Sequence, residues 1–520
     1  MTAASLLAGP LRAALAARAR EAVERGGIAV ARVEVAARDG AGLALFAAVA
    51  CDAVACDAGA RDAGATSRDE AGGSRAVRAA VDRARAADLA VGSGERFYWD
   101  QPSERRALAA LGAVASVEAS GAERLDVAAA RARALFARIA LAADGAPTEL
   151  APALVGGFAF EPEDGARGDW AGFAPLSFAL PALGWARDGN RAHAFAAAAP
   201  GPGESPASLA ARIEAALAPL AAALGDARVD DALRRPPATA SAYTARPDRP
   251  HADYLAAVDA ARDAIGVGAL EKVVVARSLA VETDVPYDAV ALLASLRRVH
   301  ATSTVFAVAR GDGVFAGATP ERLLRIDGDR LATAALAGTA PRGRSPDEDD
   351  RLARALRESE KDQEEHAFVA RDIEAVIAPF VERVERDEAP DLLALDGIQH
   401  LHTPIGGRLV ARADGGRPHL FEIAARLHPT PAVGGAPRAA ARAWIRAHER
   451  LARGWYAGGV GFATATGGGE LRVALRSGLV RGAHARLFAG AGIVAGSVPE
   501  NELAETRLKL RAMLSQLTEI

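Results

Sequence analysis

The chain has 520 residues, of which 50% are hydrophobic and 25% charged, a composition typical of soluble globular proteins. Its 62 lysines and arginines nearly balance its 66 aspartates and glutamates, and the net charge of −4 argues against a protein that coats nucleic acid or an anionic membrane. Because Arg, Asp or Gly interrupts every alanine-rich stretch, no apolar run approaches the roughly 20 residues that span a bilayer.

The N-terminal part of the chain is rich in Ala, Arg and Asp. Residues 1–27 mix Arg with Glu and lack the apolar segment of a signal peptide, so they predict a helix. Residues 28–35 and 154–160 have the apolar character of strands. Cys51 and Cys56 are too few for a disulfide framework or a four-cysteine zinc site, and two ordinary thiols indicate the reducing cytoplasm.

A proline-bearing stretch, residues 234–250, interrupts these patterns. Proline has no backbone N–H to donate and disfavours helix in the residue before it. We therefore predict a boundary here, between an N-terminal α/β part (residues 1–240) and a C-terminal catalytic domain (residues 250–520) on which it packs.

Helix and strand patterns alternate after this boundary. Residues 251–265 predict a helix and residues 270–281 a strand rich in β-branched side chains. Residues 313–326 predict a strand, a Thr-Pro turn and a short apolar continuation. One long helix is expected next, with Ser345 as its N-cap, Pro346 at its first position, and its end at Pro379.

The C-terminal elements continue the same pattern. Another helix is predicted after Pro437, followed by strands at residues 458–464, 470–477 and 485–488. The last helix is expected to open near Ser497, with Glu500 completing a capping box. Interleaved helices and strands of this kind predict an α+β fold whose sheets are covered by helices.

Two glycine-rich segments could form turns or bind anions. Neither matches a P-loop or a dinucleotide-binding fingerprint. Residues 467–469 lie between two predicted strands and are expected to form a hairpin turn. Residues 490–492 fit a backbone nest for an anion and a plain turn equally well.

Charged residues supply the other candidates. Glu502 and Glu505 share a helical face, and Lys509 lies one turn beyond Glu505. From periodicity alone this pattern favours a solvated charged face. The position of Glu505 and Lys509 just after a glycine-rich loop also suits a metal-bound carboxylate, and hard oxygen ligands would then indicate Mg²⁺. Lys272 begins an apolar strand, where a lysine either reaches solvent along its stem or, if desolvated, can serve as a base.

Eight motifs in the C-terminal half resemble the chorismate-binding enzymes, a family that includes isochorismate, salicylate, anthranilate and aminodeoxychorismate synthases. In chain order they are EKVVVARS, FAGATPERLLR, LAGTAPRG, SEKDQEEHAFV, LHPTPAVGGAP, YAGGVGF, RLFAGAGIVAGS and ETRLKL. The resemblance implies an α+β fold like that of anthranilate synthase component I, with large β-sheets packed in the centre and helices outside. In that fold the N- and C-terminal strands surround a shared sheet core.

The resemblance also implies a role for each candidate residue. Lys272 matches the lysine that activates water, where ammonia-using members usually carry glutamine, and Glu321 matches the general acid. Ala337 stands where aminodeoxychorismate synthases carry a nucleophilic lysine, which disfavours that activity. The implied Mg²⁺ ligands are Glu365, Glu502 and Glu505, with Glu365 and Glu505 the firmer two and Glu502 acting through water. The implied substrate-binding residues are Thr339, Tyr456, Arg476, Gly490, Ala491, Gly492 and Lys509.

Together these matches predict an isomerase, an isochorismate synthase that adds water to chorismate at C2 with loss of the C4 hydroxyl. The expected cofactor is Mg²⁺, and no nucleic acid, membrane or obligate protein partner is expected. RFYWDQPSERRALAALG, residues 96–112, is similar to menaquinone-type members and favours that pathway over siderophore synthesis.

Three alternatives stay open. A salicylate synthase would also eliminate pyruvate; Tyr456 and Leu475 are compatible with it, whereas Ala432 stands where such enzymes tend to carry threonine. An anthranilate synthase is disfavoured by Lys272. A non-catalytic relative is disfavoured because base, acid and acidic metal-site residues are all present. His400 and His402 form an H-x-H pair that we assign to a substrate-wall strand and not to a metal site.

Overall fold

The computed structural model describes residues 7, 9–48, 72–91, 94–145, 148, 150–164, 167–234, 242–395, 397–413 and 415–518. Cys51 and Cys56 lie outside the described residues, as do residues 235–241 of the predicted boundary segment.

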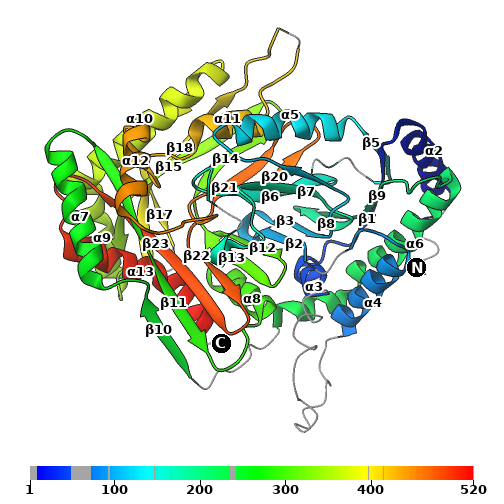
Figure 1. Cartoon of the computed structure of the whole chain (residues 1–520), viewed down its shortest axis with the longest axis horizontal. Coiled ribbons are helices and arrows are strands. Elements are labelled where there is room, and N and C mark those ends of the chain that lie inside the picture. Colours follow the sequence, from blue (N-terminus) through cyan, green and yellow to red (C-terminus); the bar gives the residue numbers. More distant parts are fainter. Residues whose placement is uncertain are drawn as a thin grey trace.

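Two large β-sheets form the centre of the molecule, and helices surround them (Figure 1). In spatial order, the first sheet contains β10 (Tyr243–Pro247), β11 (Lys272–Thr283), β23 (His484–Ile493), β22 (Ser477–Arg481), β13 (Gly313–Thr319), β12 (Thr304–Arg310), β2 (Arg96–Gln101), β3 (Arg106–Leu111), β8 (Leu183–Asp188), β9 (Arg191–Ala198), β1 (Ile28–Val35) and β5 (Ile139–Ala143), with β19 (Gly435–Ala436) beside β11.

The second sheet has ten strands. In spatial order they are β16 (Glu385–Arg386), β18 (Ile398–Arg408), β15 (Arg330–Pro341), β14 (Arg322–Asp327), β21 (Gly469–Val473), β20 (Gly459–Thr464), β6 (Ala153–Phe158), β7 (Leu176–Leu180) and β4 (Ala115–Glu118), with β17 (Asp391–Ala394) beside β18. The predicted α+β fold with central sheets and outer helices is confirmed.

The described helices are α2 (Pro10–Arg25), α3 (Ala41–Ala47), α4 (Gly72–Ala86), α5 (Arg124–Phe136), α6 (Pro206–Gly225), α7 (His251–Gly266), α8 (Ala289–Val299), α9 (Pro346–Glu358), α10 (Glu360–Ile377), α11 (Leu420–Leu427), α12 (Arg438–His448) and α13 (Pro499–Thr518). By length and composition α6 is the one described helix that could cross a membrane, which is weak evidence because core helices pass the same test. Here α6 packs on β1 and β9 and against α2 and α4.

Each sheet joins strands from both predicted parts of the chain. The first sheet passes from β2 to β12, with Trp99 opposite Phe306, and the second from β6 to β20, with Gly156 opposite Gly461. The predicted division into residues 1–240 and 250–520 stays a prediction, but the two parts share both sheets.

The hydrophobic core has two layers because neighbouring residues of a strand face opposite sides of a sheet. Along β2, Trp99 belongs to the layer between the sheets, where it makes an edge contact with Phe462 of the second sheet at 5.2 Å between ring centroids. Its neighbour Tyr98 belongs to the layer under the outer helices. All six residues of β2 are buried, so this segment serves the core.

Most predicted elements are confirmed, including the strand at residues 28–35 and the helix at residues 251–265. The long helix expected after Ser345 is wrong. Ser345 and Pro346 open α9 as predicted, but that helix ends at Glu358. Ser359 then adopts an extended conformation, and its hydroxyl accepts the Asp362 N–H as the N-cap of α10. A serine side chain that bonds the backbone competes with helix continuation.

Three C-terminal predictions also need correction. Helix α11, opened by a capping box of His419 and Glu422, was not predicted. The strand expected at residues 470–477 stops at Val473. Residues 490–492 form neither a nest nor a turn, because they lie inside β23 and pair with β11. The predicted capping box of Ser497 and Glu500 is wrong, because helix α13 begins at Pro499 and the hydroxyl of Ser497 accepts the N–H of Val494. The hairpin turn at residues 467–469 is confirmed.

Candidate active site

An open cavity lies where both sheets meet α10 and α13. Eleven of the twelve predicted site residues line it: Lys272, Glu321, Thr339, Glu365, Tyr456, Arg476, Gly490, Gly492, Glu502, Glu505 and Lys509. The exception is Ala491, which is fully buried between two lining glycines of β23 and does not reach the cavity. Alternation along the strand turns its side chain to the other face of the sheet.

Lys272, the first residue of β11, extends into this cavity and not into solvent. The residue is 3% exposed, and its Nζ lies 2.7 Å from Oε1 of Glu365 on α10. Burial acts to raise the pKa of Glu365, but the ammonium groups of Lys272, Lys509 and Lys361 hold that pKa below its usual range. The carboxylate therefore stays ionised and fixes the lysine in place.

Glycine at position 492 makes room for this ion pair. A Cβ atom there would lie 3.0 Å from Oε1 of Glu365 and 3.0 Å from Cε of Lys272. At position 490, a Cβ would lie 2.9 Å from a methyl group of Val274 and 3.4 Å from the Tyr456 hydroxyl. The two glycines thus form a flat floor under the reactive side chains.

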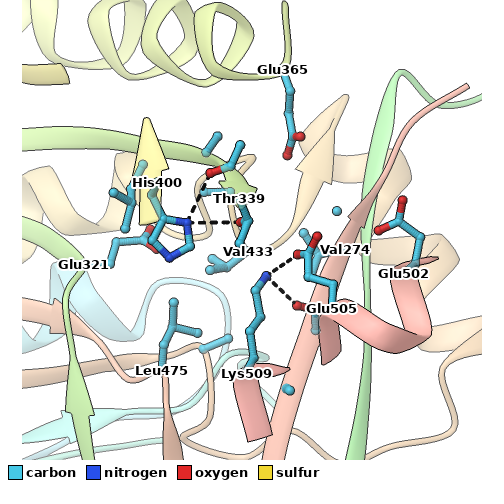
Figure 2. A pocket seen from close by; sticks show the side chains of 18 of the residues that line it. Val274, Glu321, Thr339, Glu365, His400, Val433, Leu475, Glu502, Glu505 and Lys509 are labelled. Carbon is cyan, nitrogen blue, oxygen red and sulfur yellow. Dashed lines mark hydrogen bonds and ion pairs between the residues drawn. The ribbon is translucent and has the colours of Figure 1, made fainter. Parts of the chain in front are cut away.

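Glu321 lines the cavity beside His400, at the left of Figure 2. It follows β13, and the residue is only 7% exposed. Burial raises the pKa of Glu321 to about 7, although Lys272, Lys509 and Arg476 each act to lower it. Near neutral pH this carboxyl can therefore hold a proton and donate it, as a general acid must.

Arg476 is held in the cavity by a strained backbone and by a histidine. Its φ of 48° lies in the left-handed region, which non-glycine residues seldom adopt. Its Nη2 donates to Nε2 of His400 at 3.0 Å. Burial, with the charges of Arg476 and Lys509, keeps the pKa of His400 well below its usual value, so this imidazole is neutral.

The other nitrogen of His400 orients a second predicted substrate residue. Because Nε2 accepts from Arg476, the ring proton lies on Nδ1, which is 3.2 Å from the carbonyl of Gly338 and 3.1 Å from the hydroxyl of Thr339 (Figure 2). His400 thus links two residues expected to bind substrate. The sequence analysis predicted only that His400 and His402 lie in a strand of the substrate wall. His400 does line the cavity, whereas His402 does not.

Lys509 and Tyr456 complete the wall. Nζ of Lys509 donates to the carbonyl of Gly490 at 3.0 Å and lies 2.6 Å from Oε1 of Glu505, as the dashed lines in Figure 2 show. The ring of Tyr456 stacks on Phe488 at 5.2 Å between centroids. Burial raises the pKa of Tyr456, so its hydroxyl stays protonated and can donate a hydrogen bond.

The three glutamates predicted to bind Mg²⁺ come from two helices that face the cavity, α10 for Glu365 and α13 for Glu502 and Glu505 (Figure 2). Among the residues described here, no three His, Cys, Asp or Glu side chains are grouped closely enough to hold a metal ion. The three carboxylates nevertheless interact electrostatically. Burial raises the pKa of Glu502, and the negative charges of Glu505 and Glu365 raise it further. Hard oxygen donors that repel one another fit a divalent cation such as Mg²⁺.

A buried ion pair between Arg453 and Glu449 supports the part of the cavity wall formed by Val274 and Val433. Arg453 and Glu449 are each 1% exposed, and their side chains meet at 2.5 Å. Arg453 also donates to the carbonyls of Val433 and Val274, both of which line the cavity. This arginine therefore holds the loop before β19 against β11.

Lys361 also lines the cavity and was missed by the sequence analysis. Its residue type was a signal, because only three of the 62 basic residues in the chain are lysines. All three, Lys272, Lys361 and Lys509, line this one cavity.

Comparisons with known proteins agree with this geometry. A family model described as chorismate binding enzyme matches residues 79–518. The salicylate biosynthesis isochorismate synthase of Pseudomonas aeruginosa is 39% identical over 433 residues, which cover 82% of this chain and 85% of that protein. Isochorismate synthase MenF of Bacillus subtilis is 33% identical over 437 residues, covering 82% of this chain and 88% of that protein.

Solved structures give the same picture. The menaquinone-specific isochorismate synthase MenF of Escherichia coli superposes with a TM-score of 0.64 at 27% identity, covering 84% of this chain and 91% of that one. A putative 2,3-dihydroxybenzoate-specific isochorismate synthase of Bacillus anthracis gives a TM-score of 0.63 at 26% identity, covering 84% of this chain and 99% of that one.

Proposed function

The chain belongs to the chorismate-binding enzymes, and from this premise we propose that it is an isochorismate synthase, an isomerase that adds water at C2 of chorismate while the C4 hydroxyl leaves. The observation that carries the proposal is the pairing, across one cavity, of a buried lysine with a buried glutamate whose pKa is raised to about 7. Such a displacement needs a base at one carbon and an acid at the other.

Lys272 acts as the base and Glu321 as the acid. Only the neutral amine of Lys272 can act as the base, so its ammonium must first lose a proton; the amine then accepts a proton from the attacking water as the water oxygen bonds to C2. Both double bonds of the ring diene shift, the C4–O bond breaks, and the protonated carboxyl of Glu321 gives its proton to the leaving hydroxyl, which departs as water. Burial of both groups supports this assignment, because it keeps bulk water from competing for the protons.

The substrate is a dianion, and the proposed binding residues supply its counter-charges. Arg476 meets one carboxylate with hydrogen bonds from a guanidinium that His400 holds in place. Thr339 and Tyr456 offer hydroxyls, and Lys509 adds a positive charge near the floor formed by Gly490. When bound by Glu365, Glu502 and Glu505, Mg²⁺ would neutralise the second carboxylate of the substrate.

We propose that the enzyme releases isochorismate and does not eliminate pyruvate from it. Ala432, which lines the cavity, stands where salicylate synthases tend to carry threonine. Salicylate formation is the second candidate, since Tyr456 and Leu475 on the same wall are compatible with it. For the destination of the product we propose menaquinone synthesis, on the similarity of residues 96–112 to menaquinone-type members; a siderophore route is the alternative.

Incubation of the pure protein with chorismate and Mg²⁺, followed by chromatography of the products, tests this function. We expect isochorismate in equilibrium with chorismate. Salicylate and pyruvate as main products would contradict the release of isochorismate, and anthranilate formed with ammonium would contradict water as the nucleophile. Rescue of a menaquinone-deficient bacterial strain, compared with rescue of a siderophore-deficient one, tests the destination.

The Lys272→Ala variant tests the catalytic assignment. We expect loss of turnover by at least about a hundredfold, within the range that a general base contributes, while chorismate still binds in the presence of Mg²⁺. Binding is measured by calorimetry. Turnover like that of the wild type would refute the role of Lys272.

A further inference from the structure

Lysine is almost absent from this protein except at one place. The 62 basic residues include only three lysines, and arginine fills every other basic position. All three lysines line the proposed active site. Lys272 and Lys509 have proposed roles there, whereas Lys361 has none. Its residue type and its position therefore set it apart from the arginines of the surface.

Lys361 reaches the cavity from the first turn of α10, one turn before Glu365. Its Nζ lies 3.6 Å from Oε1 of Glu502 on α13, so the pair bridges the two helices that carry the proposed metal ligands. The side chain of Lys361 is 47% exposed, whereas that of Glu502 is only 5% exposed. The ammonium group can thus leave the pair for solvent, but the carboxylate remains in the cavity.

The other two proposed metal ligands, Glu365 and Glu505, also form an ion pair with a lysine. Lys272 pairs with Glu365 at 2.7 Å, and Lys509 pairs with Glu505 at 2.6 Å. Each proposed metal ligand therefore has one lysine as a cationic partner. A divalent cation that binds these carboxylates must compete with three ammonium groups for them.

The difference between lysine and arginine explains why these positions are not arginine. A guanidinium binds a carboxylate through two parallel hydrogen bonds, as Arg133 does with Glu422 at 2.9 Å for both contacts. An ammonium is a point charge on a flexible stem, and that of Lys361 meets Glu502 at one oxygen, Oε1. An arginine at position 361 would occupy both oxygens of Glu502, while lysine leaves one oxygen unengaged by the pair.

We propose that Lys361 is a releasable counterion of Glu502. Its ammonium group keeps this buried carboxylate in the cavity and leaves the carboxylate when a divalent cation binds there. The inference rests on the proposed function, because it takes Glu502 as a ligand of that cation. Lys361 is a positioning residue: it acts through Glu502 and does not touch the reacting atoms.

Direct titration of the full-length protein with Mn²⁺, followed by calorimetry or electron paramagnetic resonance, tests the proposal without relying on activity. We expect Lys361→Arg to weaken Mn²⁺ binding about tenfold, because a bidentate partner holds Glu502 more firmly. We expect Lys361→Met to tighten binding about threefold, because the competing charge is gone. Arg386→Met is the matched control: Arg386 pairs with Glu374 of the same helix at 3.2 Å, outside the cavity lining, and its loss should leave the affinity unchanged.

Equal Mn²⁺ affinity in the wild type and in Lys361→Arg would overturn the proposal, as would weaker binding in Lys361→Met. Circular dichroism of both variants checks that they fold, which the half-exposed position favours. If the wild type binds Mn²⁺ and makes isochorismate while the arginine variant binds equally well, the inference alone fails. If Mn²⁺ binds with the expected order of affinities but chorismate is not converted, the proposed function fails and the inference stands.

Discussion

Glu321 shows how burial of one side chain can serve catalysis at the expense of stability. Its pKa is raised to about 7 from an ordinary value of 4.5, so between these values the folded protein binds more protons than the unfolded chain. The stability tied to this proton is fully present below pH 4.5 and is lost as the pH rises through 7. Keeping Glu321 as a proton donor therefore lowers the free energy of unfolding, and the loss grows as the pH rises.

Glu321→Gln tests both consequences. At pH 8 we expect the variant to be more stable than the wild type by on the order of 3 kcal/mol, because the amide carries no charge to bury. Turnover should fall by at least about a hundredfold. Urea unfolding at pH 5 and pH 8 provides the comparison, with the gain confined to the higher pH. The wild-type kcat/KM should decline above pH 7; a flat profile up to pH 9 would argue against Glu321 as the acid.

Gly492 illustrates a residue whose role is to leave space. Its replacement by alanine would bring a methyl group to 3.0 Å from both members of the Lys272–Glu365 pair. We expect Gly492→Ala to lower kcat about tenfold while the protein stays folded, since misplacement of a catalytic group by a fraction of an ångström is costly. Gly496→Ala is the matched control, because nothing lies within 4 Å of a Cβ there. Equal rates in the two variants would show that the glycine is not needed.

At the level of elements, local signals located most of the helices and strands that the sequence analysis named, but not the other described elements and not how the elements meet at the site. Ser345 and Pro346 marked the start of α9 correctly, because a cap is set by residues next to it in sequence. The role of the glycines of β23 could not be predicted from local sequence. Glycine is needed there because Glu365, Val274 and Lys272 approach from other elements, and no local pattern contains that information.

The buried Arg453–Glu449 pair joins elements in a way that mutation can measure. Arg453→Met leaves Glu449 as a lone charge at 1% exposure, so we expect a loss of about 3–5 kcal/mol in unfolding free energy. Adding Glu449→Leu should recover part of this loss, because no isolated charge remains buried. Urea denaturation of the two single variants and the double variant gives the coupling energy; full additivity would contradict the pairing.

At the scale of the whole molecule, the sharing of both sheets places the site. The proposed catalytic residues come from the C-terminal half, yet the sheets that position them continue into N-terminal strands through the β2–β12 and β6–β20 pairings. Sequence patterns predicted β6 and β20 but not β2 or β12, and they predicted neither pairing, because the partners are separated by about two to three hundred residues. The resemblance to a family, more than any periodicity, anticipated the shared core and gathered the site residues.

This sharing predicts that residues 242–520 will not fold without the N-terminal half. Removing residues 1–241 would expose the edges of β12 and β20 and take Trp99 away from Phe462. Exposed, unpaired strand edges favour aggregation. We therefore expect the isolated C-terminal fragment to be insoluble or to lack a cooperative thermal transition in circular dichroism. Co-expression with residues 1–241 should restore a soluble complex that binds chorismate, because the pairing surfaces are then supplied in trans. A fragment that melts cooperatively and binds chorismate alone would show that the catalytic half is an independent domain.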